Sequence, residues 1–368
     1  MGDRAWVPLG SFAQARPEHG PSTARARGGT VDAATPLTVK ENPVSTSHPV
    51  TATTTQQAAT AAPSILVLGG TGLMGREVLA ALRRRGATAR VLVRDPARLA
   101  TLEGVEVVVG DLRDPDSLAR AVQGVSTVFH ISPHEVDEVE LTRGVIRACE
   151  RAGARLVFAG VHVSAGNALA GWLVRRVYGR ILPRYRGKFA IGRLVETSAT
   201  DPVILVPSNF MQNDEVLLDV IRGGEFVHPC SAKGLNRVDL RDVGEAAATV
   251  LLDRSVPSGS YSVVGPRSLT GPECAQVWSE ALGVPVRYAG DEDDALEAAL
   301  TRHLTGHRRE DWLASLRMLR GFGVKASPRQ LAETQRLLGR PPTDFRDFVA
   351  RVAAEHVPAP AHAGPSQE

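Results

Sequence analysis

Between Ser64 and Phe210 the sequence alternates short apolar runs with amphipathic segments. The apolar runs are SILVLGG, TARVLVRD, VEVVVGDL, STVFHISP, ARLVFAGVHV and DPVILVPSNF, and the segments between them include GREVLAALRRRG, DPDSLARAVQGV and DEVELTRGVIRACERAG. Strands that alternate with helices of this length predict βαβ units and a parallel sheet. Because the runs are continuously apolar, we expect the sheet to be buried on both faces. The pattern therefore predicts an α/β fold with a doubly wound parallel sheet.

After Phe210 the regular alternation stops. VDLRDVGEAAATVLL predicts a strand and then a helix, GSYSVVG predicts a strand, and SLTGPECAQVWSEALG predicts a helix capped by Ser or Thr. The rest, from DDALEAALTRHL to TDFRDFVARVA, is mainly helical in pattern. We therefore expect a small, mainly helical C-terminal lobe over the carboxyl ends of the strands, where open α/β sheets bind ligands.

These patterns divide the 368 residues into four parts. Residues 1–62 are rich in Thr, Ala, Pro and Ser without periodicity, so we expect a disordered extension. Residues 63–210 would form the sheet core, with a basic amphipathic insertion at 165–187. Residues 211–356 would form the lobe and elements that return to the core, and residues 357–368 a disordered tail.

Bulk composition excludes several classes of protein. A net charge of +3 is too small to indicate a nucleic-acid partner, and no apolar run is long enough to predict a membrane span. The cysteines are widely spaced, without a CxxC or metal-type pattern, so a reduced, cytoplasmic location is expected. Each is interpreted as a small core residue: Cys149, Cys230 and Cys274.

A glycine-rich turn joins the first strand to the first helix. GGTGLMG matches the spacing of G-x-G-x-x-G at Gly70, Gly72 and Gly75, inside a βαβ unit of the right length. Such a turn lets free N–H groups at a helix N-terminus face a pyrophosphate. The sequence therefore predicts a dinucleotide-binding Rossmann domain, whose pyrophosphate cradle comprises Gly69, Gly70, Thr71, Gly72, Leu73, Met74 and Gly75.

The end of the second strand indicates which dinucleotide is bound. Arg94 follows the apolar run of VLVRDP, whereas Asp95 stands before a proline and is interpreted as a helix N-cap. An arginine at this tip suits a 2′-phosphate, and a carboxylate would favour a free 2′-hydroxyl. We therefore expect NADP(H), while a solvated surface charge remains the alternative for Arg94.

The tips of the next two strands complete the predicted cofactor site. Asp111 and Leu112 would flank the adenine, although Asp111 could equally cap a turn. Residues of the ISP segment would line the central ribose: Ile131, Ser132 and Pro133.

Together with VPSNFMQN, VDLRDVGEAAATVLL and LLGRPPTDFRDFV, these segments resemble the NmrA-like branch of atypical short-chain dehydrogenases. The resemblance runs from Ser64 to about Ala353. It implies an NADP(H)-binding Rossmann domain with a lobe that shapes the substrate pocket. Arg94 falls at the family's 2′-phosphate position, and Lys188 matches the family's lysine on the helix before the sixth strand. The nicotinamide end would be lined by Pro207, Ser208, Asn209 and Phe210.

The proton donor is harder to assign. Tyr185 precedes Lys188 by three residues, where a Tyr-x-x-x-Lys pair would have four, and Gly160 and Val161 stand where a catalytic serine is expected. Both spacings share a helix face, but the Ser-Tyr-Lys triad is absent. Lys188 would bind the ribose or tune the pocket charge, or else be solvated. Tyr185 is interpreted as a packing residue rather than an acid, and His162 as a replacement proton donor or a buried histidine satisfied by the backbone.

The remaining histidines and a basic segment are weaker candidates for a functional site. His130, His134 and His162 lack the neighbouring ligands that a metal site would need, so none is predicted. His303 and His307 are interpreted as part of a solvated helix face. The stretch 172–186 has an apolar stripe opposite arginines, which favours a lid over a hydrophobic substrate, with peripheral membrane contact or plain packing as alternatives.

The resemblance implies two functions from different classes. One is an NADPH-dependent reductase that transfers hydride to a small hydrophobic acceptor, such as a quinone or another carbonyl, with Lys188, His162 and Tyr185 as candidate catalytic residues. The other is a non-catalytic NADP(H)-sensing regulator that binds a protein partner, since the family includes both kinds of member. A homodimer is a further expectation.

Overall fold

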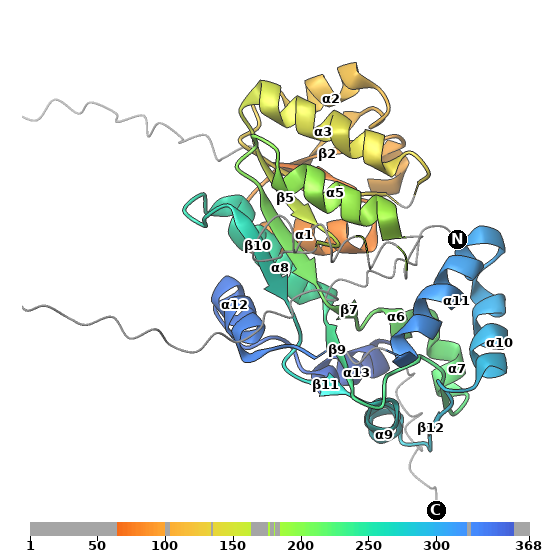
Figure 1. Ribbon diagram of the computed structural model, residues 1–368. Coiled ribbons are helices and arrows are strands. Elements are labelled where there is room, and N and C mark those ends of the chain that lie inside the picture. The colour runs from red at the N-terminus through yellow and green to blue at the C-terminus, as the bar shows by residue number, and fades with distance from the viewer. Residues whose placement is uncertain are drawn as a thin grey trace, which may run out of the picture. The chain divides into compact units, whose positions relative to one another are not determined.

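The computed structural model describes residues 65–99, 104–133, 135–162, 176, 180, 185–321 and 325–356 (Figure 1). Several predictions concern other residues and lie outside this description. They are the extension at 1–62, the tail at 357–368, the side chains of His134 and His307, and nearly all of the basic insertion at 165–187, including its interpretation as a lid.

The predicted doubly wound parallel sheet is confirmed. Its strands run in the order β10 (Gly259–Val263), β6 (Val203–Pro207), β5 (Arg155–Ala159), β4 (Thr127–His130), β1 (Ile65–Leu68), β2 (Ala89–Val93) and β3 (Val105–Val109). Every neighbouring pair in this sheet is parallel. The strand order reverses between β1 and β4, so a crevice is expected at their carboxyl ends.

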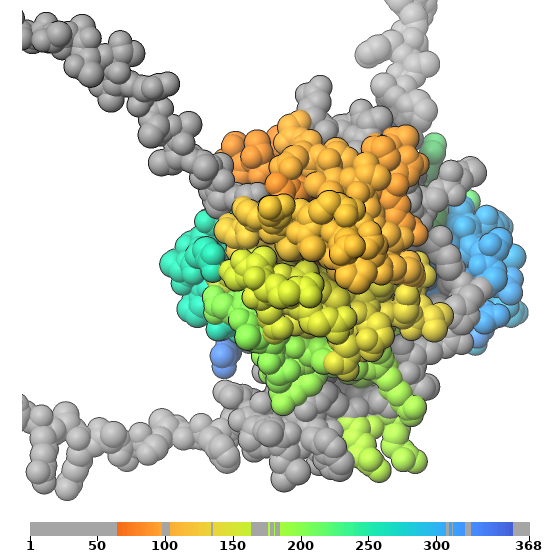
Figure 2. Space-filling view, turned by 90° about the horizontal axis from the view of Figure 1, so that it is seen from above, coloured from red at the N-terminus to blue at the C-terminus, as the bar shows by residue number. Residues whose placement is uncertain are grey.

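Helices cover both faces of the sheet because successive residues of a buried strand point to opposite sides. Ile65 and Val67 pack in one cluster with α1 (Leu73–Arg84) and α8 (Leu240–Leu252). Leu66 and Leu68 pack in another, with α2 (Pro115–Val122), α3 (Glu138–Ala152) and α5 (Arg186–Glu196). Figure 2 shows α2, α3 and α5 as adjacent bands across this second face.

Strand β3 departs from the expectation that every strand is buried on both sides. Val107 is 42% exposed and Val109 is 56% exposed. The reason is position, because β3 is the last strand of the sheet and pairs with β2 alone among the described strands. A short 3-10 helix, η1 (Pro96–Leu99), lies in the connection between β2 and β3.

The lobe is mainly helical, as predicted. Its elements are β7 (Asn209–Phe210), α6 (Asn213–Val216), α7 (Leu218–Arg222), β8 (Glu225–Phe226), β9 (Leu235–Val238), β11 (Ser268–Leu269), α9 (Gly271–Leu282), β12 (Arg287–Tyr288), α10 (Asp293–His303), α11 (Gly306–Gly321) and α13 (Phe345–His356). The predicted cap of α9 is confirmed, since Thr270 and Glu273 form a capping box.

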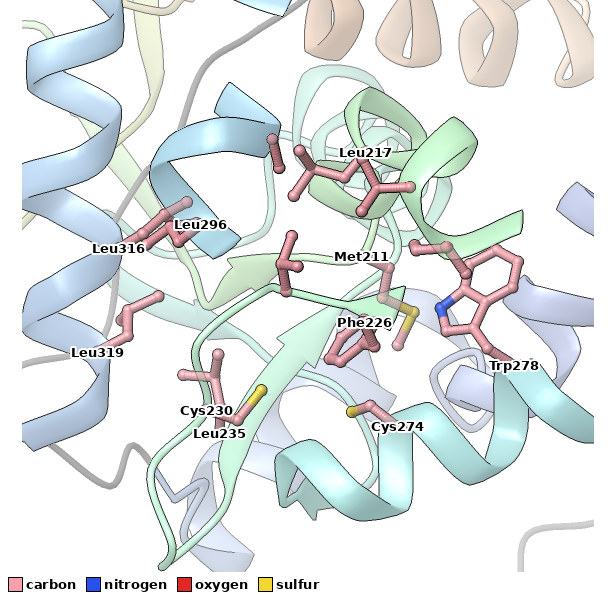
Figure 3. Close-up of a cluster of buried hydrophobic side chains, with 14 of the residues drawn as sticks. Met211, Leu217, Phe226, Cys230, Leu235, Cys274, Trp278, Leu296, Leu316 and Leu319 are labelled. Atoms are coloured by element: carbon pink, nitrogen blue, oxygen red, sulfur yellow. The ribbon is translucent and has the colours of Figure 1, made fainter. Parts of the chain in front are cut away.

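The lobe has its own apolar core (Figure 3). Side chains from several helices and short strands meet there, including Met211, Leu217, Phe226, Cys230, Leu235, Cys274, Trp278, Leu296, Leu316 and Leu319. All three cysteines of the chain are buried free thiols, as the interpretation as core residues expects.

Three elements from the C-terminal half return to the Rossmann core. Helix α8 lies on α1, and β10 extends the main sheet beside β6. Helix α12 (Pro328–Leu338) then covers the outer edge of β10, where Glu333 Oε2 accepts from the N–H of Ser262 at 2.6 Å and Thr334 Oγ1 accepts from that of Val264 at 3.0 Å. Within the described residues, no helix is long and apolar enough to cross a membrane.

Candidate cofactor and active site

The glycine-rich turn forms a tight loop between β1 and α1. Gly69 has a φ of +79°, and its carbonyl oxygen accepts from the N–H of Gly72 at 3.0 Å. Helix α1 begins at Leu73, one residue after its N-cap Gly72. A β-carbon on Gly75 would lie 2.2 Å from the Gly69 carbonyl oxygen, so only glycine allows the helix to approach the turn this closely.

The outer side of this turn remains open to a ligand. A β-carbon on Gly72 would meet only the Gly69 carbonyl oxygen, at 3.4 Å, among the described residues. Within the described residues, no side chain caps the N-terminus of α1, and its first turn contains no acidic residue. The positive end of the helix dipole is therefore not neutralised there by a described side chain, as binding of a pyrophosphate requires.

The predicted adenosine side of the site lies at the tips of β2 and β3. Arg94 is exposed just after β2. Asp95 Oδ1 accepts from the N–H of Ala97 at 3.0 Å, in agreement with its interpretation as a cap. Asp111 Oδ1 accepts from the N–H of Arg113 at 2.9 Å, which is the turn-capping alternative. Leu112 is half-buried and packs against the sheet.

Across the crevice, the loop after β4 meets the glycine turn. A β-carbon on Gly69 would lie 2.9 Å from Cγ2 of Ile131, so this loop and the turn are in close contact. Ser132 is buried and Pro133 half-buried beside Ile131. The structure thus brings the predicted ribose-lining loop against the glycine turn that is predicted to hold the pyrophosphate, at the reversal of strand order.

Lys188 reaches the same loop from α5. Its Nζ donates to Ser132 Oγ at 2.9 Å and to the Pro133 carbonyl oxygen at 3.4 Å, and it makes a short ion pair with Glu138 Oε2. The Lys188 side chain is 5% exposed and that of Glu138 is 12% exposed. The alternative of a solvated helix lysine is therefore wrong.

His130 lies beneath this group as a neutral, buried side chain. Burial, together with the nearby charge of Lys188, lowers the pKa of His130 to about 3. Its Nε2 is 3.1 Å from the Thr142 hydroxyl, which itself donates to the Glu138 carbonyl oxygen at 2.9 Å. His130 is thus a packing residue that supports α3 rather than a cation at neutral pH.

The structure does not gather the three candidate catalytic residues at one point. The Tyr185 hydroxyl lies 3.4 Å from Ser315 Oγ on α11, and burial raises the pKa of Tyr185 to about 12. His162 Nε2 lies 3.6 Å from Glu196 Oε1, at the opposite end of α5 from Lys188. Glu196 follows Lys188 by eight positions on the helix, which is about 12 Å along the axis. Of the three, Lys188 contacts the predicted ribose loop.

The segment after β6 supplies buried polar groups near the carboxyl end of the sheet. Pro207 ends β6, and Phe210 packs in the core cluster under α8. Within the described chain, Ser208 Oγ and Asn209 Nδ2 are buried without a hydrogen-bond partner. Buried polar atoms of this kind usually have partners, so these two fit a site that a polar ligand completes.

Sequence reasoning missed Glu138, which was part of an amphipathic helix with no assigned role. Acidic residues in the first turn of a helix are common because they complement the helix dipole, so nothing local distinguishes Glu138. Its partner is 50 residues later in the chain. Gly187 was missed for the same reason, since a β-carbon there would lie 2.7 Å from Glu138 Oε1.

Among the residues that the structure describes, no group of three or more His, Cys, Asp or Glu side chains could hold a metal ion.

His303 is predicted to lie on a solvated helix face. Its side chain is partly exposed, and its Nε2 lies 2.9 Å from Asp219 Oδ1 on α7.

A parallel sheet with this reversal of strand order and a glycine-rich turn between its first strand and first helix define a Rossmann fold. Residues 62–307 match the model of the NmrA-like family. The chain belongs to this family, as its sequence motifs predict.

Two curated proteins and one solved structure align with this chain over nearly their whole length. NAD(P)H azoreductase of Xenophilus azovorans is 30% identical, over 79% of this chain and 98% of its own. The (4-alkanoyl-5-oxo-2,5-dihydrofuran-3-yl)methyl phosphate reductase of Streptomyces griseus is 32% identical, over 80% and 99%. The crystal structure of Citrobacter sp. triphenylmethane reductase complexed with NADP(H) aligns with a TM-score of 0.64 at 24% identity, over 78% and 99%, and supports the fold.

Proposed function

We propose that the protein is an NADPH-dependent reductase that transfers hydride to a small, electron-poor, conjugated acceptor such as a quinone. The observation that supports it best is the buried Lys188–Glu138 pair at the ribose loop, combined with a tyrosine hydroxyl directed at α11 instead of a proton-donating triad. Such a site can hold and orient a reduced cofactor without a strong general acid.

NADP(H) is the cofactor in this proposal, in agreement with the relatives named for it. The residues of the glycine turn would hold the pyrophosphate, and Arg94 the 2′-phosphate. Lys188 would donate to a ribose hydroxyl, while Ser208 and Asn209 would offer polar groups at the nicotinamide end. The bound cofactor supplies a hydride, and the protein orients it and excludes water.

The absence of the Ser-Tyr-Lys triad from the sequence supports this class of acceptor. Reduction of an isolated ketone creates an alkoxide that needs a proton donor within hydrogen-bond reach. A quinone delocalises the new charge, so the hydroquinone anion is already a stable product. The two sequence relatives are named as an azoreductase and as a reductase of an oxo-dihydrofuran. The azo group and the oxo-dihydrofuran ring in these names are also conjugated acceptors.

A steady-state assay tests the proposal. The purified protein is mixed with NADPH and a panel of quinones, azo dyes and simple ketones, and the loss of NADPH absorbance is followed. We expect turnover with conjugated acceptors and little with simple ketones. Tight NADPH binding without turnover on the whole panel would contradict the proposal and favour the NADP(H)-sensing regulator.

Arg94→Glu tests the cofactor assignment in the same assay. Removal of a charge-assisted contact to phosphate is expected to weaken NADPH binding by about tenfold to a hundredfold and to leave NADH binding nearly unchanged. Arg83→Glu, a reversal of charge at the other end of α1, is the matched control and is expected to change neither. Equal losses for NADPH and NADH in Arg94→Glu would remove Arg94 from the 2′-phosphate site.

A further inference from the structure

We infer that Glu138 is the positioning residue for Lys188, holding its ammonium group at the ribose loop so that it can donate to the cofactor. This inference rests on the proposed function, since it assigns Lys188 to an NADP(H) ribose. It goes further by giving a role to a carboxylate on a different helix.

The contacts around Lys188 Nζ support a directed role. Among the described residues three acceptors lie around it, namely Glu138 Oε2, Ser132 Oγ at 2.9 Å and the Pro133 carbonyl oxygen at 3.4 Å. The contact to Pro133 is the longest of these, so a ribose hydroxyl would replace this acceptor. Two of the three acceptors belong to the loop that contacts the glycine turn, and the third comes from α3. The carboxylate therefore holds the ammonium on the cofactor side of α5.

Charge explains why the lysine needs this carboxylate. Burial lowers the pKa of Lys188, and the charge and hydrogen bond of Glu138 oppose that shift. Among the described residues, the other titratable group that acts on Lys188 from a packed element is His130, which is neutral. Asp137, next to Glu138, is engaged with Arg113, whose Nη2 lies 2.9 Å from its Oδ1. Without Glu138, Lys188 would therefore lose its proton more readily.

The fold fixes the position of Glu138 from three sides. It lies in the first turn of α3, which packs on α5. The Thr142 hydroxyl donates to its backbone carbonyl and also contacts His130. Gly187 leaves the space that Glu138 Oε1 occupies. These contacts hold the Glu138 carboxylate in one position, next to Lys188. An ion pair on the surface that only added stability could adopt many geometries.

Lysine labelling tests the inference without any cofactor. The chain has only four lysines, Lys40, Lys188, Lys233 and Lys325, so each amine is resolved by mass spectrometry after competitive acetylation across a pH series. In Glu138→Gln we expect the midpoint of Lys188 labelling to move to lower pH, while the other three midpoints stay fixed. An unchanged Lys188 midpoint would overturn the inference.

Cofactor binding gives the second readout. In Glu138→Gln we expect NADPH affinity close to that of the parent protein at pH 6 and weaker by about tenfold or more at pH 9, because the neutral amine is a poorer donor. The parent protein should show a flatter profile. Glu138→Asp, which keeps the charge, should restore much of the affinity at pH 9.

A double substitution separates positioning from general damage. In a Lys188→Met background, Glu138→Gln is expected to have no further pH-dependent effect on NADPH binding. Glu140→Gln is the matched control, because Glu140 lies on the same helix but is exposed and pairs with Arg143. A pH-independent loss in Glu138→Gln that persists with Lys188→Met would mean that Glu138 is only structural.

These outcomes are distinct from failure of the proposed reductase. If the parent protein binds NADPH without turnover, the reductase proposal fails, while the labelling and binding profiles still decide the role of Glu138. If labelling shows the shift but NADPH binding is equal in both proteins at every pH, Glu138 controls Lys188 without serving the cofactor, and the inference is overturned.

Discussion

Gly75 has no room for a side chain, because the Gly69 carbonyl oxygen occupies the place of its β-carbon. Gly75→Ala is expected to lower the free energy of unfolding by about 1–3 kcal/mol and to weaken NADPH binding, since backbone must shift in the cradle. Urea unfolding and equilibrium binding measure both. Gly144→Ala, inside α3 with ordinary contact to Leu118, is expected to raise stability by roughly 0.5–1 kcal/mol. Equal effects of the two substitutions would contradict the packing argument.

Glu77 on α1 provides a pH-dependent prediction at the same scale. Burial raises the pKa of Glu77, despite the opposing charges of Arg241, Arg84 and Arg351. A carboxyl with a raised pKa stabilises the fold below its unfolded pKa, and that contribution is lost as pH rises through the folded pKa. Glu77→Gln cannot ionise, so its stability relative to the parent should improve between pH 4 and pH 8. Parallel unfolding free energies across this range would disprove the prediction.

At the scale of elements, α12 acts as a cover for the sheet edge at β10. Thr334 Oγ1 accepts from the N–H of Val264 and donates to the Ser262 carbonyl oxygen, at 3.0 Å in both cases. Thr334→Val keeps the shape but leaves a buried N–H without its acceptor, which should cost about 1–3 kcal/mol of unfolding free energy. Thr301→Val, at an exposed site on α10, is the control and should change stability by less than about 0.5 kcal/mol.

Most helices and strands can be predicted from local sequence signals, but the solvent exposure of their side chains cannot. Apolar runs, glycine turns and Ser or Thr caps are local signals, so the strands and most helices were predictable. The solvent exposure of Val107 and Val109 depends on which strand ends the sheet, and strand order is a long-range property. The glycine cradle was predictable because its spacing is contiguous. The Glu138–Lys188 pair was not, because two helices meet there only after folding.

The direction of a side chain is also set by packing rather than by its place in the sequence. His162 follows β5 and could have faced the cofactor, yet its ring lies against α5 near Glu196. A β-carbon on Gly192 would be 2.7 Å from the Val161 carbonyl oxygen and 3.1 Å from His162 Nδ1. The close approach that Gly192 permits therefore determines the place of His162, and no local pattern signals it.

For the whole molecule, a buried ion pair lies where the chain passes between lobe and core. Arg237 on β9 makes two hydrogen bonds to Asp214 on α6, at 2.6 and 2.9 Å, and the side chains are 2% and 0% exposed. Trp278 Nε1 also donates to Asp214. Strand β9 continues directly into α8, which packs on the Rossmann core.

Asp214→Ala is therefore expected to destabilise the protein by about 3–5 kcal/mol, because it leaves a buried guanidinium without its counter-charge. Asp219→Ala, which removes an exposed partner of His303, should cost less than about 1 kcal/mol. Circular dichroism and tryptophan fluorescence during urea unfolding would measure both. A loss of under 1 kcal/mol for Asp214→Ala would show that the pair is dispensable.

The two margins of the main sheet differ in what they permit. Side chains of α12 bond to backbone groups of Ser262 and Val264 at the outer edge of β10, whereas β3 ends the described sheet with exposed valines and no further described strand beside it. Backbone groups along such a border are a template for pairing with another chain. Growth by strand addition would thus proceed from one side alone. If two molecules paired through their β3 strands, neither would have a second exposed edge strand in the described sheet. This mode of association would therefore stop at a dimer and could not build a fibre.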